Sequence, residues 1–146
     1  FFFFFFFFFF FFFFFFLSFF LSFFLLYPLV AQERCVDPAA AAAVWFKPDE
    51  TAEGAAAVLD RLPDGRFLIH NAPDGLGFVV TYRYNGRTYH RTLEVSFKGV
   101  FFEDSCRSFP TLSDFVAHCC HADTAEDVDM PCRLVVPGSK RRAVPG

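Results

Sequence analysis

The first 30 residues of this chain have no charge and almost no chemical variety. Twenty of the 28 phenylalanines lie within the first 24 positions, and Glu33 is the first charged residue. All 13 basic and all 16 acidic residues fall between Glu33 and Arg142. The sequence therefore predicts two unlike parts: an uncharged leader at residues 1–31, and a charged segment of about 115 residues, which suits one small domain.

Two interpretations of the leader stay open. Residues 1–26 are uncharged and long enough to cross a bilayer as a helix, which is typical of a membrane anchor or a signal segment. However, neither an initiator Met nor a basic region precedes the apolar run, which indicates a fragment. Phe, Leu and Ser codons can all be written in pyrimidines, so the second hypothesis is that residues 1–31 are translated from the pyrimidine tract of an intron. We expect membrane attachment only if the leader is genuine.

Composition excludes several classes of protein. A net charge of −3 argues against a generic nucleic-acid binder. Five cysteines without a C-x-x-C pair argue against a zinc ribbon or a thioredoxin-like site, and they suit a reducing compartment better than a disulfide framework. We therefore expect a cytoplasmic domain with no cofactor.

Sequence patterns after the leader predict alternating helices and strands. Acidic and hydroxyl residues at 49–51 precede an Ala-rich run at 55–59, which indicates a helix start. Asn85-Gly86 between two β-rich runs is a strong hairpin signal. A second helix is expected after 109–111, with Leu112, Phe115, Val116 and Cys119 as its apolar face. The expected strands are 67–69, 78–84, 87–95, 99–102 and 133–137.

This order predicts an α+β domain with a central antiparallel sheet flanked by two helices. The predicted core contains Trp45, Phe67, Ile69, Val79, Leu93, Phe101, Leu112, Phe115 and Leu134.

Four sequence blocks follow one another in this segment: Trp45-Phe46, DGRFLI at 64–69, GFVVT at 77–81 and FPTLSDFV at 109–116. Taken in this order, they resemble the Src homology 2 (SH2) family. Trp45-Phe46 looks like its opening aromatic pair, and DGRFLI at residues 64–69 resembles its D-G-x-F-L-[VI] strand. GFVVT at residues 77–81 and FPTLSDFV at residues 109–116 resemble its G-x-[YF]-x-L-S strand and its second helix. The third strand with its histidine, His90, and a closing segment at residues 131–137 complete the resemblance, which implies an SH2-like domain at 44–138 and a tail at 139–146.

The resemblance implies a non-catalytic module that binds phosphotyrosine peptides, but one residue departs from the pattern. In the family an Arg at the end of the F-L-V strand binds the phosphate with its planar fork. His70 stands there in this chain. Imidazole is shorter than the Arg side chain and mostly neutral at pH 7, so we expect phosphotyrosine binding to be weakened or lost.

Other positions of the expected phosphate pocket also lack donors. The first-helix Arg of the family most nearly corresponds to Ala52, and the loop at residues 71–75 reads NAPDG, which adds the negative Asp74. The third-strand Lys corresponds to Thr92, or to Arg91 with a slip of one residue. The candidate phosphopeptide-binding residues are therefore His70, Asn71, His90 and Arg91.

Three functional interpretations follow from these residues. The first is a peptide-binding or adaptor module in tyrosine-kinase signalling, whose partner is a tyrosine-containing or phosphotyrosine peptide. The second is a structural module inside a larger kinase, such as a Janus kinase, or inside an adaptor; His70 and the start of the second helix look like that branch. The third is an enzyme, for which a pair such as Cys120 and His90 has no supporting motif.

Two further clusters carry no chemistry in this interpretation. On a helix the four residues at 118–121 (HCCH) point about 100° apart and cannot all reach one ion, so no metal site is expected. The basic residues at 140–142 are expected to be a solvated tail.

Overall fold

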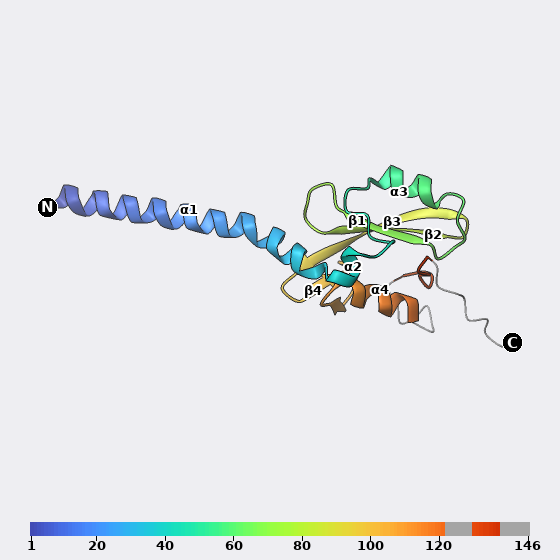
Figure 1. Cartoon of the computed structure of the whole chain (residues 1–146). Coiled ribbons are helices and arrows are strands. Elements are labelled where there is room, and N and C mark those ends of the chain that lie inside the picture. The colour runs from blue at the N-terminus through green and yellow to red at the C-terminus, as the bar shows by residue number, and fades with distance from the viewer. Residues whose placement is uncertain (122–129, 138–146) are drawn as a thin grey trace.

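The computed structural model describes residues 1–121 and 130–137 (Figure 1). A long helix, α1 (Phe2–Cys35), projects from a small α+β domain, and a short helix, α2 (Pro38–Ala41), follows it. The domain itself contains helices α3 (Ala52–Leu59) and α4 (Leu112–His121). The tail expected at 139–146 and its basic residues lie outside the described residues.

One five-stranded sheet forms the centre of the domain. Its strands follow the order of the chain, and every neighbouring pair is antiparallel. They are β1 (Phe67–Asn71), β2 (Phe78–Tyr84), β3 (Arg87–Ser96), β4 (Gly99–Phe101) and β5 (Ser108–Phe109). The predicted fold class, an antiparallel sheet between two helices, is confirmed.

The two faces of the sheet are covered by different helices (Figure 1). Alternation along β1 places Phe67 and Ile69 in the large core with the apolar face of α4, and places Leu68 in a small cluster with Ala55 and Leu59 of α3. Because His70 is two residues after Leu68, its side chain lies on the α3 face of the sheet.

The β2–β3 hairpin has the geometry that its Asn-Gly pair predicts. Asn85 and Gly86 both have positive φ, at 49° and 71°, as a two-residue turn with the twist of the sheet requires. The Asp64 carboxylate accepts hydrogen bonds from both backbone N–H groups, at 2.9 and 3.1 Å. This turn fixes the register of β2 against β3 and pairs Thr81 with His90.

The helix starts are also as predicted. Thr51 caps α3 by accepting a 3.1 Å hydrogen bond from the backbone N–H of Gly54. Thr111 caps α4 in the same way through the N–H of Asp114. The sequence analysis did not anticipate β5, because its two residues are too few for a periodic pattern.

Three details of the prediction are wrong. No strand forms at 133–137: the described part of this segment is tied by single backbone bonds from Leu134 to Cys119 and from Val135 to Gly65, without a ladder. Val79 and Phe101 are only half-buried. Their chain neighbours point into the main core instead, because successive strand residues face opposite sides of a sheet.

The end of helix α1 packs against the domain. Helix α1 continues past residue 31 to Cys35, which is buried in the domain core together with Ala40. The packed unit therefore begins upstream of residue 44. Along its outer part α1 is long and apolar enough to cross a membrane, judged by length and composition.

We predict that a fragment comprising residues 31–146 folds as the domain does in the full chain. It keeps Cys35 and Ala40 of the core and the hydrogen bonds of Gln32 described below. A matched fragment starting at residue 44 should be less stable by about 2 kcal/mol or more, because it loses these contacts. Urea denaturation followed by circular dichroism compares the two. Equal stability would contradict the packing of the α1 end on the domain.

Packing on the α4 side gives a second prediction, in the same fragment. Phe115 is 1% exposed and contacts the rings of Phe102 and Phe109, at centroid distances of 5.6 and 5.7 Å. Phe115→Ala should lower the free energy of unfolding by about 3–5 kcal/mol. The matched control is Phe97→Ala, at a ring that is 80% exposed, which should change it by less than about 0.5 kcal/mol. Similar effects of the two substitutions would contradict this core.

Candidate functional site

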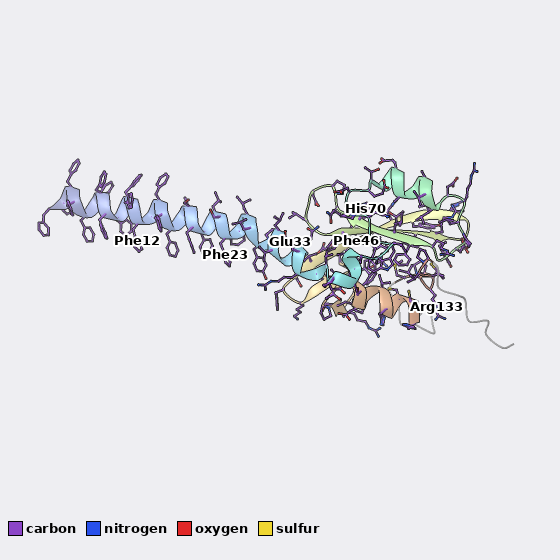
Figure 2. All side chains as sticks on the ribbon, in the orientation of Figure 1. Phe12, Phe23, Glu33, Phe46, His70 and Arg133 are labelled. Carbon is purple, nitrogen blue, oxygen red and sulfur yellow. The ribbon has the colours of Figure 1, made fainter. Side chains whose placement is uncertain are left out.

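Three polar side chains form a continuous hydrogen-bonded row on the α3 face of the sheet. His70 on β1 is 1% exposed and Thr81 on β2 is fully buried, while His90 on β3 is exposed. The Thr81 hydroxyl lies 3.4 Å from Nε2 of His70 and 2.8 Å from Nδ1 of His90. At the other side of its ring, Nδ1 of His70 lies 3.0 Å from the carbonyl oxygen of Asn71. Figure 2 labels His70 beneath α3.

The partners of this row determine where the hydrogens lie. A carbonyl oxygen can only accept, so Nδ1 of His70 must carry a hydrogen and donate it to Asn71. In the neutral ring Nε2 of His70 is then an acceptor, which the Thr81 hydroxyl fills. A hydroxyl has one hydrogen, so Nδ1 of His90 donates to Thr81. Every bond of the row is thus satisfied with both imidazoles neutral.

In the neutral form both nitrogens of the His70 ring are engaged within the chain. A neutral imidazole has one N–H donor, and that of His70 is already bonded within the chain. Its ring is also almost completely covered. Neutral His90 donates inward from Nδ1, so Nε2, its second nitrogen, is an acceptor.

The loop at residues 71–77 bonds most of its own donors. The N–H of Ala72 donates to the Gly77 carbonyl at 3.0 Å, and that of Gly75 donates to the Ala72 carbonyl at 2.9 Å. The N–H of Leu76 donates to the Asp74 carboxylate at 2.9 Å. The loop therefore presents a carboxylate and few backbone donors where a phosphate would approach.

Gln32, near the end of α1, holds the two ends of this loop together. Its amide nitrogen donates to the Asn71 side-chain oxygen at 3.2 Å and to the Gly77 carbonyl at 3.0 Å. Its amide oxygen accepts from the N–H of Gly77 at 3.1 Å. The Gly77 position requires glycine, because its φ is +115° and a Cβ there would lie 2.5 Å from the carbonyl oxygen of Leu93. The candidate residue Asn71 is thus engaged with α1 and faces away from the His70 row.

Arg91 is separated from the other candidates. The residue beside His90 on a strand faces the opposite side of the sheet, and Arg91 pairs in register with Val80 of the main core. Its guanidinium lies over the Phe102 ring at 3.9 Å and donates to Asp104 at 2.6 Å. Of the four candidate residues, the structure therefore brings the side chains of His70 and His90 together and leaves those of Asn71 and Arg91 outside their row.

Three of the five cysteine thiols are harder to ionise than an exposed thiol. Burial raises the pKa of the thiols of Cys35, Cys120 and Cys132. Cys119 is buried in the core, while the neighbouring His121 is exposed. Among the described residues, no three His, Cys, Asp or Glu side chains lie together as metal ligands would.

Comparison with known proteins agrees with this architecture. The structure is similar to the SH2 domain of the Monosiga brevicollis CRK/CRKL homolog, solved in solution by NMR, with a TM-score of 0.52 and 23% sequence identity. The match covers 60% of this chain and 83% of that one. No family model matches the sequence, and no curated protein matches it. The domain thus has the SH2 fold, with a divergent sequence.

The sequence analysis missed Thr81 and Gln32. Thr81 could have been found, because a two-residue turn at 85–86 makes the residue numbers of each β2–β3 pair sum to 171, which places Thr81 opposite His90. Gln32 could not, since its contacts span 39 and 45 residues of sequence and no local pattern reports them.

The Thr81 hydroxyl gives a prediction for this row. Thr81→Val keeps the shape of the side chain but removes the hydroxyl that connects the two rings, so it should lower the free energy of unfolding by about 1–3 kcal/mol. Thr92→Val, at an exposed position on β3, is the control and should have an effect near zero. Thermal unfolding of both variants at neutral pH is the measurement. A neutral effect of Thr81→Val would show that the row does not stabilise the fold.

Proposed function

We propose that this chain carries a non-catalytic peptide-binding or adaptor module of tyrosine-kinase signalling, in which phosphotyrosine binding is weakened or lost. Two observations support it: the SH2 fold, and the hydrogen-bonded row that contains His70, the residue that the family resemblance aligns with the phosphate-binding Arg. Five cysteines without a C-x-x-C pair suit the reducing environment of the cytoplasm.

The observation that carries this proposal is the bonded N–H of His70. An Arg at this place would bring a permanent charge and paired donors, whereas neutral His70 gives its one hydrogen to Asn71. Removing one partner of a hydrogen-bonded charge pair costs about 2–5 kcal/mol, which corresponds to a thirtyfold or greater loss of affinity. Asp74 adds repulsion at the exposed loop.

A weak, pH-dependent site is compatible with the same geometry. Protonation of exposed His90 would add a charge and turn its second nitrogen into a donor. The charged form of His90 is therefore the one that would contribute to a weak phosphate contact.

The alternative is a structural module inside a larger kinase or adaptor. One observation favours it: the His70–Thr81–His90 row is complete without a ligand, as expected of side chains that serve stability alone. The substitution described next separates the two functions.

His70→Arg should restore part of the phosphate contact. The new side chain enters from the end of β1 under the loop at residues 71–77, and we expect a Kd for a phosphotyrosine peptide in the micromolar range or weaker, about −8 kcal/mol at best. Adding Asp74→Ser should improve it, because this removes a negative charge while the hydroxyl can still accept the N–H of Leu76. Isothermal calorimetry at pH 6 and pH 7.5 measures both.

His121→Arg is the matched control, because it adds the same charge at an exposed position at the end of α4. It should leave peptide affinity unchanged. If neither the single nor the double variant binds phosphopeptide at millimolar concentration while both remain folded, the pocket is closed in shape, and the structural module replaces the binding module.

A further inference from the structure

Helix α1 presents a large apolar surface that the domain does not cover. From Phe2 to Leu26 it carries no charge, and its most apolar 18-residue window has a mean hydropathy of 2.7 with none of its residues buried. Figure 2 shows the phenylalanine side chains on all sides of the helix, including Phe12 and Phe23. A protein partner would need one apolar stripe, whereas a helix that is apolar all round matches lipid.

The length of this surface also fits lipid. About 20 apolar residues cross the hydrocarbon core of a bilayer, at 1.5 Å per residue. The 34-residue helix supplies that length before Tyr27, and its only charged residues, Glu33 and Arg34, lie in its last turn. A tyrosine followed by charged residues is typical of the boundary between membrane and water.

A second element of the domain lies beside Tyr27, at the expected boundary between membrane and water. The turn between β3 and β4 adjoins the end of α1, and the two enclose a groove of about 550 Å³. Its lining includes Phe23, Leu26 and Tyr27 from α1, and Phe97 and Lys98 from the turn. Phe97 is 80% exposed although it is a large apolar ring, and the Lys98 ammonium lies 5.7 Å from its centroid.

The charges around the groove have one sign. Arg34 from α1 and Lys98 from the turn line it, and no acidic residue within the described ranges does. The part of the lining that α1 contributes near Phe23 is apolar, and Phe23 lies inside the uncharged stretch of α1. Two cations beside an apolar recess match the phosphate and the upper acyl chain of an anionic phospholipid.

We propose that a bilayer containing anionic phospholipids covers both surfaces: α1 crosses it, and the β3–β4 turn rests in its interface. Phe97 enters the boundary of the acyl chains, while Arg34 and Lys98 contact lipid phosphates. Because Gln32 bonds the end of α1 to the loop at residues 71–77, the membrane then holds the domain in one orientation. This proposal is independent of peptide binding.

The test uses the full chain synthesised in the presence of phosphatidylcholine vesicles, with and without phosphatidylserine. Phe97→Trp places a fluorophore in the turn, and Val58→Trp, exposed on α3 away from α1 (Figure 1), is the matched control. Lipids brominated near the headgroup end of the acyl chain should quench Phe97→Trp at least about twofold more than Val58→Trp. Lys98→Trp reports the same turn if Phe97→Trp does not fold.

Equal quenching at the turn and at α3 would overturn the interfacial contact. Arg34→Glu combined with Lys98→Glu should abolish any increase in quenching that phosphatidylserine causes, and an unchanged increase would overturn the role of the two cations. Alkaline carbonate should leave the chain in the vesicle pellet, and its release would show that α1 does not span the bilayer.

Discussion

The hydrogen bond from Nδ1 of His70 to the Asn71 carbonyl is the constraint on which the site depends. It fixes the position of the ring hydrogen and makes Nε2 an acceptor for the Thr81 hydroxyl, which in turn accepts from His90. Because 1% exposure leaves the ring no contact with water, these partners must satisfy it completely. His70 is thus a buried side chain whose two ring nitrogens both have hydrogen-bond partners within the chain.

The surrounding structure supports this row from three directions. The Asn85-Gly86 turn sets the register that places Thr81 opposite His90, and the carboxylate of Asp64 holds that turn. Leu68 packs beneath α3 and fixes the face on which His70 lies. Gln32 closes the adjoining loop from α1. The position of the row is thus set by contacts from the turn, from α3 and from α1.

Local patterns predicted most of the fold because each has a local physical cause: capping at Thr51, the left-handed turn at Asn85, and apolar spacing on α4. The sequence also indicated that His70 lacks the donors of Arg. It could not reveal which atom holds the ring hydrogen, nor that Arg91 turns toward Asp104, because both depend on contacts between distant residues. Val79 was misplaced because a buried strand with apolar residues on both faces gives no period-two signal.

The central claim is that the His70 ring carries its hydrogen on Nδ1, and nitrogen NMR of the imidazole rings observes that hydrogen directly. In the fragment at residues 31–146, labelled with ¹⁵N-histidine and held at pH 7.5, long-range ¹⁵N–¹H correlation distinguishes the two neutral tautomers and the charged ring. Our account predicts that His70, assigned by its loss in His70→Gln, is neutral with the hydrogen on Nδ1. A ring with its hydrogen on Nε2, or one that is charged at this pH, would contradict it, because His70 would then retain a donor for a phosphate.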